Sequence, residues 1–464
     1  MSDLCFLPAT ELIGLIAARK VSSEEVTRGF LERIERYDPL LRAFITVDAE
    51  EALAEARAVD ASRDSRGQLH GVPVAIKDNI ATRGMRTTAG SRILANWIPS
   101  IDAPVVRRLK EQGAVILGKT NMHEFAYGGT CTNVEFGAVR NPWHTDHVPG
   151  GSSGGSGAAV AAGLAPLALG TDTAGSIRLP ACQCGIVGLK PTYGRVSIQD
   201  VVPLAWSLDH VGPMTRTVAD AALLFSVLAG WEPTDPTSKQ RPSTDFLRHD
   251  QGIGGMRLGI PHAYFFDGLQ PDVETAVNQA LDVLRSLDAE LVDVDWPGVE
   301  LSNSVTWTII MGEASAYHRA WFRERPDDYS AETRANLELA MTLPAADYVQ
   351  AQRARTVLQQ RVAEVLSGVD ALVTPALAIT APRIGQTRVN VGGKVKEINP
   401  VFIRLADPFN VTGLPAISVP CGFGLDGLPI GLQIAAAPFA EEVVLRVANA
   451  YEQATDWHRR RPPL

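Results

Sequence analysis

The amino-acid sequence predicts an α/β protein, because short apolar runs with strand character alternate with helical patterns. Residues 72–76 and 114–117 are predicted strands, and the helical pattern at 103–112 between them ends at Gly113. Alternation of this kind builds a sheet with helices packed on it. Hydrophobic residues make up 45% of the 464 residues and charged residues 20%. The chain can therefore bury a large core and is not a disordered or solvating segment.

The first fifty residues are predicted to be helical. Leu12 and Ile16 fall on one helix face, and Ser22 and Glu25 have the spacing of a capping box at a helix start. We expect Pro39 to end the helix that begins there, because proline lacks the N–H that a helix interior needs.

The later part of the chain alternates in the same way. Residues 233–256 are rich in Pro, Thr, Ser and Asp and are predicted to form a surface loop. After this loop the patterns predict, in order, a strand at 258–261, a helix at 273–287, a long helical stretch at 302–367, strands at 371–374 and 416–420, and a final helix around 443–451.

Charge and cysteine content exclude several classes of protein. The net charge of −9, with a pI near 5.6, argues against a general nucleic-acid or anionic-membrane binder, which needs clustered basic charge. Five scattered cysteines form neither a disulfide framework nor a zinc module. The N-terminal residues show no basic region followed by an apolar stretch, so no secretory signal is expected. The small apolar run 158–169 is too short to span a bilayer. A soluble cytoplasmic protein is the expectation.

One motif predicts nucleotide binding but lies in the wrong context. Residues 113–120 match G-x-x-x-x-G-K-[ST], the pattern of a phosphate-binding loop. That loop needs a strand before its first glycine and a helix opening at its lysine. Here a helical pattern ends at Gly113 and the residues between the glycines are an apolar strand. We favour a helix end followed by a strand and keep an NTP-binding protein as a remote alternative.

Two glycine-rich segments carry the strongest indication of chemistry. The first, 150–157, holds Ser152, and the second, around 170–176, holds Ser176. Glycine lets backbone N–H groups and a neighbouring hydroxyl approach a ligand closely. A hydroxyl becomes a useful nucleophile only when a base accepts its proton, and none of the nine histidines lies in a nucleophile–base pattern. Lys77, at the end of an apolar strand, is a candidate base because burial would lower its pKa.

These segments closely resemble the amidase signature family of serine hydrolases. The motifs that carry the resemblance are the Lys77 strand, Gly-Gly-Ser-Ser-Gly-Gly-Ser at 150–156, Asp-Thr-Ala-Gly-Ser-Ile-Arg at 172–178, Gly-Leu-Lys-Pro-Thr-Tyr-Gly-Arg at 188–195, and the C-terminal segments 412–421 and 427–433. The resemblance implies one domain over 1–464, built on a large mixed sheet with helices on both faces. It also implies a motif core at about 65–220 and a variable helical region at about 221–400 that shapes the substrate site.

The resemblance assigns roles to individual residues. Ser176 becomes the nucleophile, Ser152 the bridging serine and Lys77 the base of a triad that acts through an acyl-enzyme, with no metal or other cofactor. The peptide bond between Gly151 and Ser152 is expected to be cis. The oxyanion and substrate-binding residues are expected to be Thr173, Ala174, Gly175, Tyr127 and Gly151, with the backbone N–H of Ser176 as a further oxyanion donor. Ala174 stands where the family usually has glycine, so its methyl group could narrow the pocket.

Other polar and aromatic residues have more than one interpretation. Asp172 and Arg178 are as well explained by a pair that braces the loop as by substrate contact, whereas Ser153 and Ser156 are expected to be loop and helix-cap residues. His144 and His147 lack a third metal ligand nearby in the sequence. A further aromatic group is favoured as core by its helical spacing, namely Trp307, Tyr317, Trp321 and Phe322.

Three functions remain open from the sequence. The first, which we favour, is metal-independent hydrolysis of a small amide, anilide or carbamate, with esterase side activity. The second is that of the glutamine-hydrolysing subunit of a glutamyl-tRNA(Gln) amidotransferase. In that subunit the resemblance implies an acidic residue that meets the glutamine ammonium. A gap-free alignment places this position at Ile403, with Asp407 four positions away. The third is the NTP-binding protein. For the first we expect a small-molecule substrate, no direct nucleic-acid partner and no membrane, and we leave a homodimer open.

Overall fold

The computed structural model describes residues 4–62, 67–242, 246 and 250–464. Most of its strands belong to one sheet: β1 (Phe44–Val47), β2 (Pro73–Lys77), β3 (Val115–Thr120), β4 (Leu167–Asp172), β5 (Val187–Lys190), β6 (His210–Thr215), β7 (Arg257–Ile260), β8 (Glu290–Asp293), β9 (Ala371–Pro375), β12 (Ala416–Phe423) and β13 (Pro429–Ala436). A separate hairpin is formed by β10 (Arg388–Val391) and β11 (Lys394–Glu397).

The sheet is mixed, as the sequence predicts. Its eleven strands lie in the order β1-β3-β2-β4-β6-β5-β12-β13-β9-β7-β8. Strand β2 runs parallel to β3 and β4, and β7 runs parallel to β8 and β9, whereas the other neighbours are antiparallel. Because the carboxyl ends of β2 and β4 lie at the same edge, the segments that follow them meet there.

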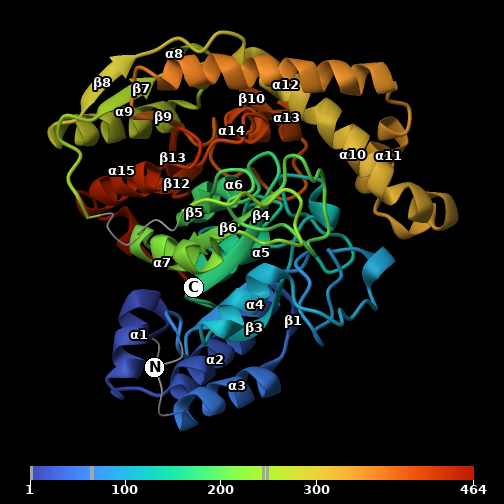
Figure 1. Ribbon diagram of the computed structural model, residues 1–464, viewed down its shortest axis with the longest axis vertical. Coiled ribbons are helices and arrows are strands. Elements are labelled where there is room, and N and C mark those ends of the chain that lie inside the picture. Colours follow the sequence, from blue (N-terminus) through green and yellow to red (C-terminus); the bar gives the residue numbers. More distant parts are fainter. Residues whose placement is uncertain (1–3, 63–66, 243–245, 247–249) are drawn as a thin grey trace.

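Helices cover both faces of this sheet (Figure 1). The crossover from β2 to β3 contains α4 (Pro104–Glu111), and the crossover from β3 back to β4 contains α5 (Gly154–Ala161). The two right-handed crossovers run in opposite directions across the sheet, which puts α4 and α5 on opposite faces. On the α4 side lie α7 (Val218–Leu228), α15 (Glu441–Gln453) and α9 (Pro271–Ser286); on the α5 side lies α6 (Arg178–Cys184).

The remaining helices lie at two ends of the molecule. At the bottom of Figure 1 are α1 (Ala9–Ala17), α2 (Ser23–Leu41) and α3 (Ala49–Ala61); at the top and right are α10 (Ser302–Glu324), α11 (Ala331–Ala340) and α12 (Ala345–Leu366). Three shorter helices complete the set, namely α8 (His262–Phe265), α13 (Ile398–Ile403) and α14 (Pro408–Val411).

One sequence prediction of a helix end is wrong. The capping box of Ser22 and Glu25 forms at the start of α2, but α2 continues through Pro39 to Leu41. Pro39 lies in the last turn: the helix ends two residues later at Leu41, and Arg42 follows in the left-handed conformation, so few helical bonds are disturbed. The predicted helical stretch at 302–367 is confirmed and consists of three helices, because Pro326 and Pro344 lie between them. The part of the predicted loop 233–256 that the structure describes contains no helix or strand, and 243–245 and 247–249 lie outside the described residues.

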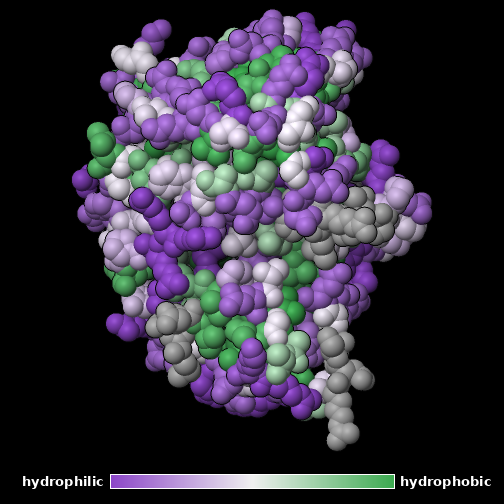
Figure 2. Space-filling model, turned by 90° about the vertical axis from the view of Figure 1, so that its left-hand side faces the viewer, coloured by the Kyte–Doolittle hydropathy of each residue, from purple (hydrophilic) through white to green (hydrophobic). Residues whose placement is uncertain are grey.

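The buried apolar residues form two clusters. The larger one fills the space between the sheet, α7, α9, α15 and the N-terminal helices. The smaller one lies among α10, α12, α13 and residues 122–127. On the face seen in Figure 2 hydrophilic residues predominate, with hydrophobic residues in smaller groups between them. No helix in the described ranges is long and apolar enough to cross a membrane. That the chain forms a single domain over 1–464 stays a prediction.

Candidate active site

Lys77 ends β2 and is completely buried. Its Nζ donates to Ser152 Oγ and to Thr171 Oγ1, each at 2.7 Å. Burial lowers the pKa of Lys77 to about 7, against the opposing effect of the negative charges on Asp172 and Asp209. Lys77 can therefore be neutral near pH 7 and accept a proton from a bound hydroxyl.

Ser152 lies in the glycine-rich loop that precedes α5, and the peptide bond from Gly151 to Ser152 is cis, as expected. The backbone of Ser152 is fixed, because its carbonyl accepts from the His123 N–H at 3.1 Å. Gly151 lies against the backbone of Gly129 and Cys131, where a Cβ would come within about 3 Å. Gly151 is not among the residues that line the pocket, and its predicted role in oxyanion or substrate binding stays untested.

Ser176 lies between β4 and α6 and is 7% exposed at the wall of a pocket. Its backbone carbonyl accepts from Ser153 N–H at 3.2 Å, which joins the two serine loops. In the described part of the chain no hydrogen bond links the hydroxyls of Ser152 and Ser176. Catalytic hydrogen bonds often tighten only when substrate binds, so the geometry brings the three predicted triad residues together without completing the relay.

Asp172 and Arg178 brace the nucleophile loop. Asp172 accepts from the N–H groups of Gly175 at 2.7 Å and Ile177 at 3.2 Å, and from Arg178 at 3.1 Å. Burial alone would raise the pKa of Asp172, but Arg178 and the hydrogen bonds hold it well below its ordinary value. Of the two interpretations that the sequence left open, the structure supports the bracing pair.

Arg178 extends this network to the C-terminal strands. Its guanidinium donates to the Gln433 side chain at 2.7 Å, to the Ala406 carbonyl at 2.9 Å and to Asn410 Oδ1 at 2.5 Å. Asn410 in turn donates to Asp172 at 2.8 Å. Five donor groups from four residues thus fix one carboxylate, so contacts with α14 and β13 help to set the conformation of the Ser176 loop.

The predicted oxyanion donors divide into two groups. The Gly175 N–H donates to Asp172 at 2.7 Å, and its predicted role as an oxyanion donor stays untested. Gly175 has a positive φ of 121°, and a Cβ at this position would collide with Ala406 and Leu179, so the loop needs a glycine here. The N–H groups of Thr173, Ala174 and Ser176 have no partner among the described residues, which leaves them free to bind an oxyanion. Ala174 lines the pocket with its methyl group.

Sequence reasoning missed two polar residues of the site. Thr171 holds the Lys77 ammonium, and Asp209 accepts from Thr173 Oγ1 at 2.5 Å. Asp209 is buried, and burial raises its pKa to about 6. Thr171 was detectable as the neighbour of Asp172 on the strand beside Lys77. Asp209 follows Leu208 in a loop with no motif that we recognised, so only the fold reveals it.

The pocket beside Ser176 is lined by uncharged residues: Ala126, Tyr127, Gly128, Gly129, Thr173, Ala174, Ser176, Leu179, Leu204, Trp307, Ile310, Asn399 and Ile403. Tyr127 stacks on Trp307 with ring centroids 6.3 Å apart. Trp307 therefore belongs to the pocket, contrary to the expectation of a core role, because α10 passes over the 126–129 segment. Tyr317, Trp321 and Phe322 pack in the apolar cluster around Phe125 and Tyr329.

The acidic residue Asp407 does not reach this pocket. It is completely buried and accepts from Asn303 at 2.9 Å, and burial raises its pKa well above the ordinary value. Ile403, four residues earlier at the end of α13, lines the pocket instead. No Asp, Glu, Lys, Arg or His belongs to the lining found among the described residues.

Three other groups of sequence candidates have structural roles. Ser153 and Ser156 bond to β4 through Thr171 and Leu169 rather than capping α5. Lys119 of the nucleotide-binding pattern is buried in strand β3 and donates to Thr87 Oγ1 at 2.8 Å, so 113–120 contains no phosphate loop. The rings of His144 and His147 lie 4.5 Å apart, and the described residues hold no group of three side chains placed to bind a metal.

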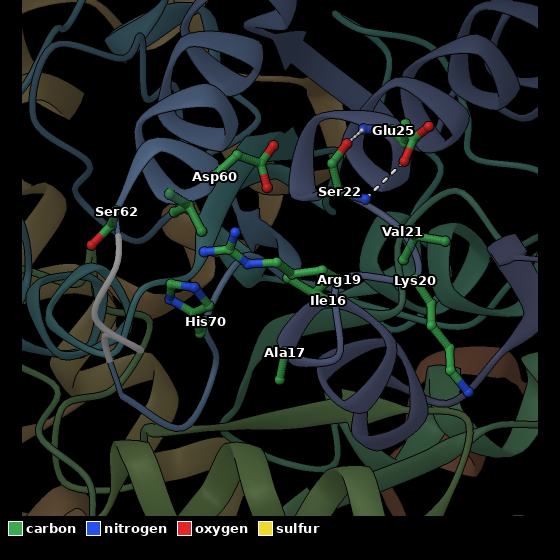
Figure 3. A pocket seen from close by; sticks show the side chains of 11 residues that line it. Ile16, Ala17, Arg19, Lys20, Val21, Ser22, Glu25, Asp60, Ser62 and His70 are labelled. Carbon is green, nitrogen blue, oxygen red and sulfur yellow. Dashed lines mark hydrogen bonds between the residues drawn. The ribbon is translucent and has the colours of Figure 1, made fainter.

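A larger hollow, of about 520 Å³, lies away from this site between α1, α2 and the end of α3. Figure 3 shows the Arg19 side chain extending toward Asp60 and His70 there. The Ser22–Glu25 capping box forms another wall. None of the residues with predicted chemistry lines this hollow, so size alone does not mark the reactive site.

Known proteins resemble the chain over nearly its whole length. The family model of the amidases matches residues 25–445. The A subunit of the glutamyl-tRNA(Gln) amidotransferase of Trichlorobacter lovleyi is 45% identical, over 97% of this chain and 97% of that protein. A solved structure of an inhibitor-bound vestigial complex related to an s-triazine catabolic enzyme superposes with a TM-score of 0.93 at 37% identity, over 96% of this chain and 98% of that one. A bacterial aryl acylamidase of the amidase signature family gives a TM-score of 0.90 at 28% identity, over 98% of each chain.

Proposed function

The chain belongs to the amidase family, and we propose that it hydrolyses the C–N bond of a small amide, anilide or carbamate whose acyl part is uncharged. The observation that carries this proposal is the uncharged lining of the pocket beside Ser176. Tyr127, Trp307 and Ile403 give one end of the pocket an apolar surface that favours an aliphatic or aromatic acyl group. Activity of the amidase class on C–N bonds follows from the family; the substrate class is the proposal.

The pocket argues against glutamine as the substrate. Free glutamine carries an α-ammonium and an α-carboxylate, and burying either charge without a partner is costly. Ile403 stands where the resemblance predicts the acid that meets the ammonium, and Asp407 is turned away into its bond with Asn303. The substrate that fits best therefore lacks both charges.

Proton transfer in the proposed reaction runs from Ser176 through Ser152 to Lys77. Neutral Lys77 accepts the Ser152 proton across the 2.7 Å hydrogen bond, and Ser152 takes the proton of Ser176 as Ser176 Oγ attacks the carbonyl carbon. The proton then returns through Ser152 to the departing nitrogen. Water releases the acyl group from Ser176 in the second half of the reaction.

Charge on the substrate oxygen is stabilised by the nucleophile loop. We assign the N–H groups of Thr173, Ala174 and Ser176 as donors, because Gly175 donates to Asp172. Removing one such donor in other hydrolases costs about 3 kcal/mol of transition-state stabilisation. The hydrogen bond from Thr173 to Asp209 and the bonds around Asp172 hold these donors in place before substrate arrives.

A substrate panel on the isolated chain tests the proposal. Purified protein is incubated with an aliphatic 4-nitroanilide, an aryl carbamate, an ester of the same acyl group and glutamine. We expect turnover of the anilide and carbamate, with the ester as a side activity, and no turnover of glutamine. Turnover of glutamine alone would contradict the proposal.

A second function is favoured by a different observation. The A subunits of several glutamyl-tRNA(Gln) amidotransferases are 42–45% identical to the chain over 96–100% of its length. By sequence similarity alone, the chain fits a glutamine-hydrolysing subunit better than a free-standing amidase. Glutaminase activity that appears only when a partner protein is added would establish this second function and replace the first.

A further inference from the structure

A second hollow lies beyond the C-terminal end of α14, where Thr412 and Gly413 belong to its lining. It encloses about 370 Å³ and is built from five separate segments. Tyr193 follows β5, Lys239 and Arg241 lie in the loop after α7, Arg355 lies in α12, and Phe439 lies between β13 and α15. It shares no lining residue with the pocket beside Ser176.

The charges around this hollow are of one sign. Lys239, Arg241 and Arg355 belong to its lining, and none of the lining residues that the structure describes carries a carboxylate. The hollow beside α1 is different, because carboxylates as well as cations belong to its lining (Figure 3). In a chain whose net charge is −9, a concave surface with three cations and no acid is a local positive field that attracts anions.

These cations remain available for a ligand. Arg355 donates to the carbonyls of Val411 and Ser207, each at 2.8 Å, so its partners are neutral oxygens. Lys239 and Arg241 form no ion pair with any residue that the structure describes. The Arg241 guanidinium stacks on the Phe439 ring 4.0 Å from its centroid, which orients it without neutralising it.

The nearest carboxylates are directed elsewhere. Glu313 accepts from the Ser207 hydroxyl and from Tyr348, and Glu441 accepts from the Thr192 N–H. Both side chains are buried, and neither belongs to the lining of the hollow. They reduce the positive field but leave the surface of the hollow cationic.

The backbone around the cations is fixed in advance. Phe439 has a φ of 67°, a strained conformation for a non-glycine residue, and its N–H donates to Thr192 Oγ1 at 2.7 Å. The N–H of Lys239 donates to the Gly194 carbonyl at 2.8 Å. A site whose frame is already ordered loses less entropy when a ligand binds.

We propose that this hollow binds a small oxyanion with two or more negative charges, of the phosphate or polycarboxylate type. Arg241 and Lys239 contact the anion from the rim, and Arg355 supports it from the α12 side. Guanidinium and ammonium groups form their strongest hydrogen bonds with such oxygens. The site is distinct from the one where hydrolysis is proposed, so binding here is measured without reference to turnover.

Calorimetric titration of the full-length protein with inorganic pyrophosphate tests the site. At about 150 mM salt, where exposed charges are screened, we expect saturable binding of one pyrophosphate per chain. The double variant Lys239→Gln/Arg241→Gln should bind at least about ten-fold more weakly, because two charge-assisted contacts are lost. The matched control is Lys394→Gln/Lys396→Gln, which removes two exposed lysines from strand β11 and should bind as the parent does.

The outcomes separate this proposal from its competitors. Citrate is titrated as a second probe. Saturable binding of either anion supports the site, and the anion that binds more tightly assigns the anion type. Equal weakening in the two double variants would show that only overall charge matters and would overturn the proposal. Tighter binding of a hexaglutamate peptide than of both small anions would also overturn it, in favour of an acidic protein partner. Unchanged anilide turnover in the variants keeps this result separate from the proposed hydrolysis.

Discussion

The nucleophile loop and the substrate pocket lie side by side but are built in opposite ways. The loop around Ser176 is held by ionic and backbone hydrogen bonds that converge on Asp172. The pocket is held by apolar packing of Tyr127, Trp307 and Ile403, which come from three distant segments. In the proposed function the reaction thus depends on a rigid polar network, whereas the choice of substrate depends on apolar side chains that can be exchanged at lower cost in stability.

Ser176→Ala should have the largest effect on turnover. Removing the nucleophile is expected to lower kcat for an anilide by about 10⁴-fold or more, as in other serine hydrolases. Steady-state kinetics measures this, and thermal unfolding should show the parent Tm because the backbone contacts of the loop do not use the hydroxyl. Near-parental kcat would remove Ser176 from the mechanism.

Two neighbouring serines offer a matched test of the proton relay. Ser152→Ala removes the hydroxyl bonded to Lys77 and should lower kcat by about 10²–10⁴-fold. Ser153→Ala removes a hydroxyl that bonds only to the Thr171 backbone, so it should affect stability more than chemistry. Equal losses of kcat in the two variants would mean that the loop matters only structurally.

Arg178→Leu tests the polar network that holds the loop. It leaves the buried Asp172 carboxylate without its cation, and breaking a buried pair in this way typically costs about 3–5 kcal/mol in the free energy of unfolding. Urea denaturation of the variant measures that loss. An unfolding free energy within about 1 kcal/mol of the parent would show that the network does not hold the loop.

The pH dependence of kcat/KM reports on Lys77. Burial lowers its pKa to about 7, and the base must be neutral, so kcat/KM should rise about ten-fold per pH unit below 7 and level off above it. Asp209, whose pKa burial raises to about 6, titrates nearby, so the profile should be repeated with Asp209→Asn. The Lys77 limb should remain in that variant but move to lower pH, because the Asp209 charge raises the pKa of Lys77; its disappearance would assign the limb to Asp209.

The smallest effect is expected in the pocket. Ile403→Val removes one methylene group from an apolar wall, which is worth about 1 kcal/mol or about five-fold in kcat/KM for a butyryl anilide. Ile403→Asp should reduce turnover of the same anilide much more, because an unpaired carboxylate would be buried. Higher turnover of the butyryl anilide by Ile403→Asp would contradict the apolar pocket.

The fold class and the catalytic candidates were predictable because their determinants are local. Lys77 ends an apolar run, and Ser152 and Ser176 each lie in a glycine-rich segment that a single sequence displays. The strand at 72–76 and the capping box at Ser22 are confirmed for the same reason. Whether these residues catalyse the reaction stays a prediction.

The missed features depend on contacts between distant segments. Nothing next to Asp209 in the sequence indicates that it accepts from Thr173, 36 residues earlier. Trp307 has the spacing of a core residue, and only the path of α10 over Tyr127 places it in the pocket. The competition of Asp172 for the Gly175 N–H likewise follows from the loop conformation and not from the motif.

One comparison tests the central claim, that the pocket accepts an uncharged acyl group. Butyryl 4-nitroanilide and γ-glutamyl 4-nitroanilide have the same leaving group and differ in the charged α-carbon substituents of the glutamyl group. We predict that the isolated chain prefers the butyryl compound by at least about 100-fold in kcat/KM, because the pocket offers no partner for the extra charges. An equal or higher kcat/KM for the γ-glutamyl compound would contradict the account.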